Sequence, residues 1–316
     1  MNATNRLPGS GKYEALIERC RDLDPVPTAV VHPCEETALA GAVEAAALGL
    51  IQPTLVGPTA KIREVAKAGG IALGQIPIVD APHSHAAAAK AVELVRRGDA
   101  EILMKGSLHS DEILGAVVAR ETGLRTGRRI SHVFIIDVPT YHKVIVVTDA
   151  AINIAPTLDD KTDICQNAID LVIALGLPQP KIAILAAVET VNAKMPATLD
   201  AAALCKMAER GQIKGALLDG PLAFDNAISK DAARIKGIKS EVAGDPDILL
   251  VPDLEAGNML AKQLTFLANA DSAGLVLGAR VPIILTSRAD SVRSRIASCA
   301  VAMRVAHTRR QQLGAA

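Results

Sequence analysis

Short apolar runs alternate with longer amphipathic segments along most of this 316-residue chain. The apolar runs predict buried strands at residues 28–31, 54–56, 76–79, 102–105, 181–185, 215–219, 247–251, 273–277 and 282–285. The longer segments predict helices at residues 13–23, 35–48, 59–68, 83–97, 110–120, 160–175, 197–210, 224–235, 257–269 and 291–307. Because alternating strands and helices are typical of right-handed parallel crossovers, the sequence predicts an α/β fold.

One segment interrupts this alternation. Residues 122–129 are polar and include two glycines, and two apolar runs follow directly at 131–138 and 143–148, joined by PTYH. Two successive strands with so short a connection predict an antiparallel hairpin. The polar segment before the hairpin predicts a boundary between two domains.

The stretch from Gly278 to Ser291, GARVPIILTSRADS, combines a buried strand with candidate chemistry. Ser287 and Arg288 arrive at the carboxyl end of this strand, and Asp290 can open the next helix. Ligands of open α/β sheets bind at this end, and a guanidinium beside a hydroxyl suits an anion. Taken alone, the same residues also fit an ordinary helix cap with a solvated arginine.

Polar residues also follow four other predicted strands. They are Lys105, Ser107, His109 and Ser110 in KGSLHS; Asp149 and Asn153 in DAAINIAP; Asp219, Gly220 and Pro221 in DGPLAFD; and Asp253 and Asn258 in PDLEAGN. Each group has a structural interpretation, since these are common turn residues. Together they predict a site in a cleft between two sheets.

The composition narrows the class of protein. Three Phe, two Tyr and no Trp offer few surfaces for stacking nucleic-acid bases, and 34 basic side chains balance 34 acidic ones. We therefore expect no nucleic-acid partner, although a local basic pocket is permitted. Five scattered cysteines without a CxxC pair predict reduced thiols in a cytoplasmic protein, none of them in a loop after a predicted strand.

Several other functions lack their motifs. The N-terminus has no apolar signal segment, and no apolar run is long enough to cross a membrane. GSGK at residues 9–12 has the wrong spacing for a phosphate-binding loop, and neither GxSxG nor GxGxxG is present. His83 and His85 have no carboxylate or cysteine pattern that would complete a metal site, so we predict no metal.

Taken in order, the motifs MKGSLHSDEILGAV, VTDAAINIAP, DGPLAFDNAIS, DILLVPDLEAGNMLAK and GARVPIILTSRADS resemble the phosphate acetyltransferase and phosphate butyryltransferase family. The resemblance runs from about Thr28 onward. It implies that an acyl group, most simply acetyl, passes between coenzyme A and inorganic phosphate. It further implies no cofactor other than coenzyme A as a substrate, a homodimer, and a functional link to an acyl-phosphate kinase.

The resemblance also implies an architecture. The expected fold has two three-layer α/β/α domains, like isocitrate and isopropylmalate dehydrogenases, with the active site in the cleft between them. The first domain would join residues 1–123 to residues 276–316, and residues 124–275 would form the second.

For the reacting centre, the resemblance assigns Ser287 and Arg288. Arg288 would neutralise phosphate and the developing oxyanion, while Ser287 would orient the thiol or the carbonyl. Ser107, His109 and Ser110 would add phosphate or acyl contacts, with Lys105 as a neighbour.

Two positions depart from the acetyl branch of the family. An aspartate expected seven residues after the catalytic serine is Ser294 here, and a second arginine would fall at Thr265. Asp290 is the nearest carboxylate and the candidate base, although it equally fits a helix cap. Arg293, Arg295 and Lys262 could contact coenzyme A, but solvated surface charge is the simpler interpretation.

Three alternatives stay open. The first is a butyryl or other short-acyl transferase, because one methylene changes binding by only about 1–3 kcal/mol. The second is a metal- and NAD-dependent decarboxylating dehydrogenase of related fold, for which Asp149, Asp219 and Asp253 lack a matching arginine cluster. The third is a non-catalytic sensor of coenzyme A or acyl phosphate.

Overall fold

The computed structural model describes residues 11–287 and 290–314, which divide into two compact units. The central unit contains residues 129–272, and the split unit contains residues 13–128 together with the chain from residue 273 onward. The domain boundaries expected at residues 123/124 and 275/276 stay a prediction.

The split unit has a mainly parallel sheet in the order β3-β2-β1-β4-β11-β10. Only β10 and β11 are antiparallel to each other. The strands are β1 (Val26–Val31), β2 (Ile51–Gly57), β3 (Ile78–Asp80), β4 (Ile102–Lys105), β10 (Asp271–Leu277) and β11 (Ile283–Ile284). This arrangement makes β1, β4 and β11 parallel neighbours, so their carboxyl ends lie at one edge of the sheet.

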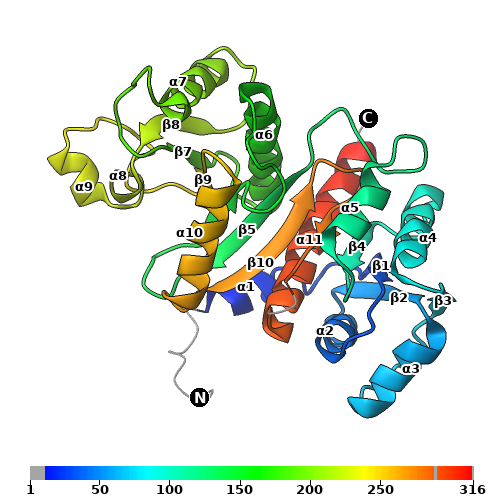
Figure 1. Ribbon diagram of the computed structural model, residues 1–316. Coiled ribbons are helices and arrows are strands. Elements are labelled where there is room, and N and C mark those ends of the chain that lie inside the picture. The colour runs from blue at the N-terminus through cyan, green and yellow to red at the C-terminus, as the bar shows by residue number, and fades with distance from the viewer. Residues whose placement is uncertain (1–10, 288–289, 315–316) are drawn as a thin grey trace. The chain divides into compact units, whose positions relative to one another are not determined.

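Helices cover both faces of the parallel strands in the split unit. They are α1 (Lys12–Glu18), α2 (Glu36–Ala47), α3 (Thr59–Ala68), α4 (Ser84–Arg97), α5 (Ser110–Val118) and α11 (Val292–Gly314). Helices α4 and α5 pack together on one side of the strands, with α2 and α3 on the other, and α2 also contacts α11 (Figure 1). Burial from both sides explains why the strands are unbroken apolar runs.

The strands of the central unit follow the order β5-β6-β9-β7-β8. Its elements are β5 (Ser131–Asp137), β6 (Ile145–Thr148), α6 (Leu158–Ala174), β7 (Lys181–Leu185), α7 (Pro196–Glu209), β8 (Leu217–Leu222), α8 (Phe224–Ile228), α9 (Lys230–Ile235), β9 (Ile248–Leu250) and α10 (Leu254–Phe266). Strands β5 and β6 form the predicted antiparallel hairpin, and the other neighbours are parallel. The α/β prediction is thus confirmed.

Several predicted element boundaries differ from those of the structure, including the following three. Pro53 lies inside β2, because the neighbour β3 pairs only with Leu55–Gly57 and leaves that side of Pro53 without a strand. The helix predicted at 224–235 is two helices, separated where Ser229 adopts an extended conformation and accepts a hydrogen bond from the Ala232 N–H. Helix α11 continues to Gly314, beyond the end predicted at residue 307.

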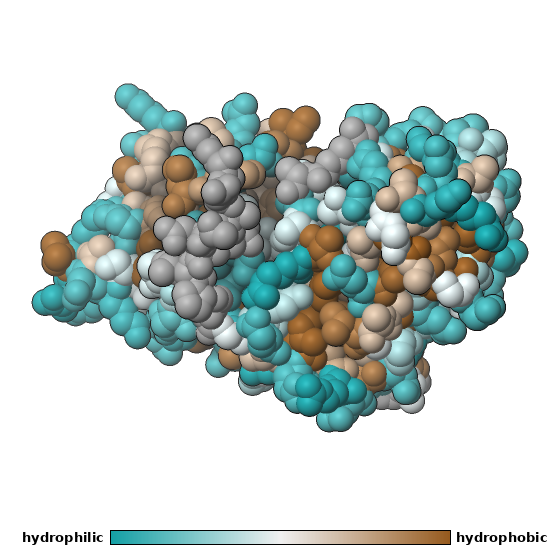
Figure 2. Space-filling view, turned by 90° about the horizontal axis from the view of Figure 1, so that it is seen from below, coloured by the Kyte–Doolittle hydropathy of each residue, from teal (hydrophilic) through white to brown (hydrophobic). Residues whose placement is uncertain are grey.

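Apolar side chains also reach the surface. Figure 2 shows brown patches interspersed with teal ones on the face seen from below. Met259 and Phe266, seven residues apart on α10, expose 59% and 73% of their area, and the adjacent Leu267 exposes 85%. Exposed apolar side chains such as these three can contribute to an interaction face.

Gly106 sets the close approach of the loops after β1 and β4. Its N–H donates to the Val31 carbonyl at 2.8 Å, and the next N–H, from Ser107, donates to the His32 carbonyl at 2.9 Å. A Cβ atom at position 106 would stand 2.5 Å from that His32 oxygen, which belongs to the backbone and cannot move aside easily.

We therefore expect Gly106→Ala to lower the free energy of unfolding by about 1–3 kcal/mol, as overpacking does. Gly115→Ala is the matched control, because it lies inside α5 with no atom within 4 Å of the new Cβ. That substitution should stabilise the protein by about 0.5–1 kcal/mol. Denaturant unfolding of both variants measures the difference, and equal stabilities would contradict the steric argument.

Candidate active site

Three polar loops of the split unit follow neighbouring parallel strands. His32 follows β1, Lys105 ends β4 ahead of Ser107, and Thr286 and Ser287 follow β11. The carboxyl ends of parallel strands are where α/β sheets bind ligands. The structure therefore brings together Lys105, Ser107 and Ser287, which were predicted separately, and adds His32, which was not.

Ser107 joins the first two loops. Its hydroxyl donates to the His32 carbonyl at 2.8 Å and accepts the Cys34 N–H at 3.0 Å. The His32 ring nitrogen Nδ1 lies 3.4 Å from the same hydroxyl. Burial, with a smaller contribution from Lys61, lowers the pKa of His32. The ring is therefore held in its neutral form at the edge of the candidate site.

The expectation that no cysteine lies in a loop after a strand was wrong for Cys34. It lies in the loop after β1 and is buried. Burial raises the pKa of its thiol, opposed by the charge of Lys61. Since the thiolate is the nucleophilic form, Cys34 is poorly suited to attack a substrate.

Arg295 is the main residue that sequence reasoning missed, because its interpretation as solvated surface charge is wrong. It is 2% exposed; Nη1 donates to Thr286 Oγ1 at 2.7 Å and Nη2 donates to the Ser287 carbonyl at 3.1 Å. Gly41 on α2 leaves the space that this side chain fills, since a Cβ there would stand 2.8 Å from Arg295 Cδ. The guanidinium therefore fixes the backbone beside Ser287.

Asp290 contacts the backbone of Ser287. Its carboxylate Oδ2 accepts the Ser287 N–H at 2.6 Å, and its own N–H donates to the Ser287 carbonyl at 3.1 Å. Burial raises the pKa of Asp290, although the Ser287 N–H and the charges of Arg295 and Lys105 oppose the rise. Arg288, the other predicted catalytic residue, lies outside the described residues.

A second buried cation lies at the same strand ends. Lys105 is 4% exposed, and its Nζ donates to the Thr286 carbonyl at 3.4 Å. Charged groups are costly to bury without compensation. Lys105 and Arg295 together make this edge of the split unit suited to a negatively charged substrate.

His109 and Ser110 lie at the start of α5, where their local contacts are structural. The His109 N–H donates to Glu112 Oε2 at 2.7 Å, and Glu112 also contacts Ser84 and lies 3.0 Å from His85 Nδ1. The Ser84 hydrogen bond is the largest cause that lowers the pKa of Glu112. Glu112 therefore anchors the start of the helix as a carboxylate.

In the central unit, Asp149 and Asn153 are brought together in one buried loop. The Asp149 carboxylate accepts the N–H groups of residues 151, 152 and 153 at 2.9–3.1 Å and the Asn153 side-chain amide at 2.5 Å. Asn153 also donates to the Ile130 carbonyl and accepts from Arg129 Nε. These contacts show that the pair shapes its own loop.

The remaining predicted residues lie on β8, after β9 and on α10. Asp253 caps α10 by accepting the Ala256 N–H at 2.9 Å, and Asn258 donates to the Ala150 carbonyl at 3.1 Å. Asp219, Gly220 and Pro221 lie on β8, which β7 and β9 separate from β6. The Asp149 loop and Asn258 are therefore in contact, whereas Asp219 stands several strands away.

Within the described part of the chain, no group of three or more His, Cys, Asp or Glu side chains is placed to hold a metal ion. Over the same residues, no helix combines the length and apolarity needed to cross a membrane. The arrangement is that of an α/β enzyme. Polar loops follow the carboxyl ends of its strands, and buried cations lie beside the loops of the split unit.

Comparison with known proteins is consistent with this class. The model of the family described as phosphate acetyl/butaryl transferase matches residues 81–303. A phosphate acetyltransferase of Rhizobium meliloti is 66% identical, with 95% of each chain covered. A phosphate butyryltransferase of Clostridium acetobutylicum is 40% identical, covering 93% of this chain and 98% of the relative.

A solved structure of a related enzyme is also similar to this chain. The branched-chain phosphotransacylase of Enterococcus faecalis V583 superposes with a TM-score of 0.77 at 32% identity, over 89% of this chain and 99% of that one. The chain belongs to the phosphate acetyltransferase and phosphate butyryltransferase family. The resemblance drawn from the motifs is thereby confirmed.

The contact between Thr286 and Arg295 generates a stability prediction. Thr286→Val keeps the shape of the side chain but leaves a buried cation without one acceptor, so we expect a loss of about 1.5–3 kcal/mol in the free energy of unfolding. Thr28→Val is the matched control, because Thr28 is equally buried but donates only to the neutral Val26 carbonyl at 2.9 Å. Chemical denaturation should find the smaller loss in the control; a reversed order would contradict the role assigned to Arg295.

Proposed function

We propose that the protein catalyses the reversible reaction of acetyl-CoA with inorganic phosphate to give acetyl phosphate and coenzyme A. The observation that carries this proposal is the 66% identity to a phosphate acetyltransferase across 95% of both chains. The buried cations beside the Thr286–Ser287 backbone support it, because both phosphate and acyl phosphate are anions.

The chemical step we propose is direct attack in a ternary complex. Written toward acetyl-CoA, Asp290 takes the thiol proton, the sulfur bonds to the acyl carbon, and the tetrahedral oxyanion collapses as the carbon–oxygen bond to phosphate breaks. A thiol with a pKa of about 8.5 is mostly protonated at neutral pH, so a base is needed. Arg288 would stabilise the oxyanion, and Ser287 would orient the thiol or the carbonyl.

The geometry around Ser287 supports this division of roles. Arg295 acts as a positioning residue, because its guanidinium binds the backbone carbonyl of Ser287. We assign it no direct contact with the reacting atoms. Ser294 occupies the position where the acetyl branch of the family has an aspartate, and its backbone N–H donates to the Ser291 hydroxyl at 3.2 Å. Asp290 is then the carboxylate nearest in sequence to the reacting serine.

The other predicted contacts belong to the same proposal. Lys105, Ser107, His109 and Ser110 would bind phosphate or the acyl group from the split unit. The central unit would contribute Asp149, Asn153, Asp219, Gly220, Pro221, Asp253 and Asn258. Because Asp149 and Asp253 already accept local N–H groups, and the Asn153 amide donates to Asp149, their contribution would come mainly through the loops that they shape.

Butyryl transfer is the second candidate, favoured by the 40% identity to a phosphate butyryltransferase. We further propose the dehydrogenase-like architecture of two three-layer domains, a cytoplasmic location and a functional link to an acyl-phosphate kinase. We also propose a homodimer, for which the apolar face formed by Met259, Phe266 and Leu267 is a candidate contact.

A thiol-release assay tests the function. Purified protein receives acetyl-CoA or butyryl-CoA with phosphate, in the absence of metal and nucleotide, and free coenzyme A is followed. We expect phosphate-dependent release, with the larger kcat/KM for acetyl-CoA. A larger value for butyryl-CoA would select the second candidate, and no release from either thioester would reject acyl transfer.

Loss of the proposed oxyanion donor should be severe. We expect Arg288→Ala to lower kcat by about a hundredfold or more while the protein stays folded. Removal of an oxyanion donor lowers kcat by a factor of this size in other enzymes. Steady-state kinetics and circular dichroism measure both properties. Near-normal turnover in a folded variant would remove Arg288 from the mechanism.

Asp290 generates a prediction about pH. Its pKa is raised by burial, so its carboxyl stays protonated, and inactive as a base, to a higher pH than an ordinary aspartate. The acid limb of the kcat/KM profile should therefore lie above pH 4 or so. Asp290→Asn should lose about a hundredfold in kcat/KM and abolish that limb. Asp159→Asn, an exposed aspartate on α6, is the control, and an unchanged limb in Asp290→Asn would exclude Asp290 as the base.

A further inference from the structure

A pocket of about 510 Å³ lies in the central unit, away from the strand ends discussed so far. Helix α9, the segment after it up to Asp245 and the start of β7 form its walls. Lys181 is the first residue of β7, and Asp247 immediately precedes β9. The pocket therefore lies at the amino ends of these parallel strands, whereas Asp253 follows the carboxyl end of β9.

Cationic side chains predominate in the lining. Lys181, Lys230, Arg234 and Lys239 line the pocket, against the carboxylates of Glu241 and Asp245. Arg234 has an exposed ion pair with Asp231 at 3.0 Å, three residues earlier on α9. Exposed pairs of this kind contribute little and are readily exchanged for another anion. The lining thus carries an excess of positive charge that can face a ligand.

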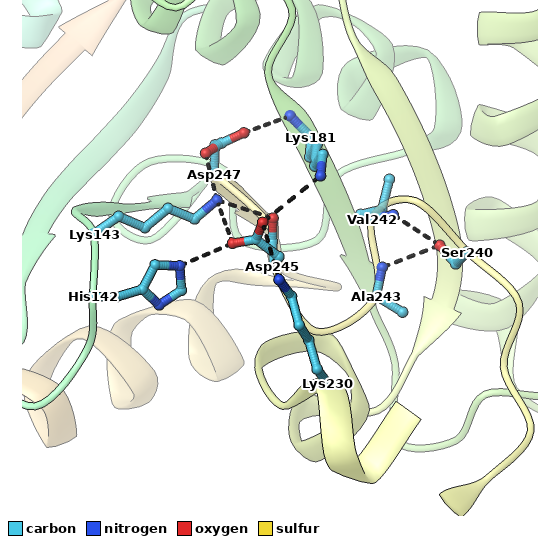
Figure 3. A network of polar contacts seen from close by, with 9 residues as sticks. All are labelled: His142, Lys143, Lys181, Lys230, Ser240, Val242, Ala243, Asp245 and Asp247. Carbon is cyan, nitrogen blue, oxygen red and sulfur yellow. Dashed lines mark hydrogen bonds and ion pairs between the residues drawn. The ribbon is translucent and has the colours of Figure 1, made fainter. Parts of the chain in front are cut away.

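Asp245 occupies the centre of the polar network, as Figure 3 shows. Its carboxylate lies 3.0 Å from His142 Nε2 and 2.9 Å from Lys143 Nζ, with Lys143 shared with Asp247 at 2.7 Å. Although burial opposes it, the hydrogen bonds from Lys143 and His142 lower the pKa of Asp245. Asp245 is therefore an anion at neutral pH, with its strongest contacts directed away from the pocket lysines.

Two lysines of the pocket lining stand farther from the Asp245 carboxylate than Lys143 does. Lys181 Nζ stands 3.7 Å and Lys230 Nζ 3.8 Å from the carboxylate, and the Lys230 side chain is 74% exposed. These distances exceed those of ordinary hydrogen bonds, so both ammonium groups can donate to a further acceptor. The single negative charge of Asp245 attracts Lys181 and Lys230 but cannot neutralise both of them.

The rest of the wall is small and apolar. Ala233, Ile238 and Ala243 line the pocket, and the hydroxyl of Ser240 accepts the N–H groups of Val242 and Ala243 at 3.0 Å, which fixes the turn. Lys236, next to the pocket in sequence, instead pairs with Glu189 and Asp225. A ligand of this site would place charged groups among the cations and an uncharged portion against the apolar wall.

We propose that this pocket binds a small phosphorylated anion carrying two or more negative charges, at a site separate from the acyl-transfer centre. A ligand with a single carboxylate would bring only one negative charge, as Asp245 already does. A polyphosphate or phosphoester offers several oxygens to lysines and an arginine on different walls of the pocket. The volume accommodates a molecule larger than phosphate itself. The inference does not depend on the proposed reaction.

Titration calorimetry with inorganic pyrophosphate tests the proposal on the full-length protein. Coenzyme A is left out of the titration because it is itself a phosphorylated anion, and substitutions in the pocket lining distinguish this site from the proposed reaction centre. We expect saturable binding that weakens as ionic strength rises. Lys230→Gln/Lys239→Gln should raise the Kd about tenfold, because two of the four cations are lost.

Two further variants sharpen the test. Lys236→Gln removes a neighbouring lysine that does not line the pocket, and it should leave the Kd unchanged. Glu241→Gln removes a lining carboxylate and should tighten binding. Absence of pyrophosphate binding, or a Kd that is the same in Lys230→Gln/Lys239→Gln and the unmodified protein, would overturn the proposal. The phosphate-dependent thiol release measured separately would be unaffected by either result.

Discussion

A buried guanidinium must find hydrogen-bond acceptors, and this requirement organises the candidate active site. Arg295 of α11 finds them in Thr286 and in the Ser287 carbonyl, at the end of β11. It can do so only because Gly41 leaves α2 without a side chain at that point. The backbone at Ser287, the proposed reacting serine, is therefore positioned by the packing of two helices against a strand, and errors in that packing would be transmitted directly to the candidate site.

The fold was largely predictable because its signals are local. Each buried strand is a short apolar run, and the hairpin is two such runs with four residues between them. The failures were also local in origin. The strand predicted at residues 54–56 begins too late, because a proline such as Pro53 is tolerated in a strand where the neighbouring strand does not reach it. The extended Ser229 was hidden inside a helical pattern.

The candidate site was predictable by position but not by role. Serine, aspartate and asparagine after strands form substrate contacts in some proteins and caps in others, and only the structure shows that Asp253 caps α10 and that Asp149 binds its own loop. Arg295 was missed because an arginine in a helix gives no sequence signal of burial. His32 could have been found, since it follows a predicted strand as the other candidates do.

The burial of the cysteines affects how the protein reacts with thiols and disulfides in its surroundings. Cys20, Cys34, Cys165 and Cys299 are buried, Cys205 is partly so, and burial raises the pKa of every one of these thiols. A protein that handles a free thiol also meets the disulfides which that thiol forms on oxidation. Mixed disulfides arise through an accessible thiolate, and this chain presents none at neutral pH. Its activity should therefore persist through oxidative conditions that convert coenzyme A to disulfide forms.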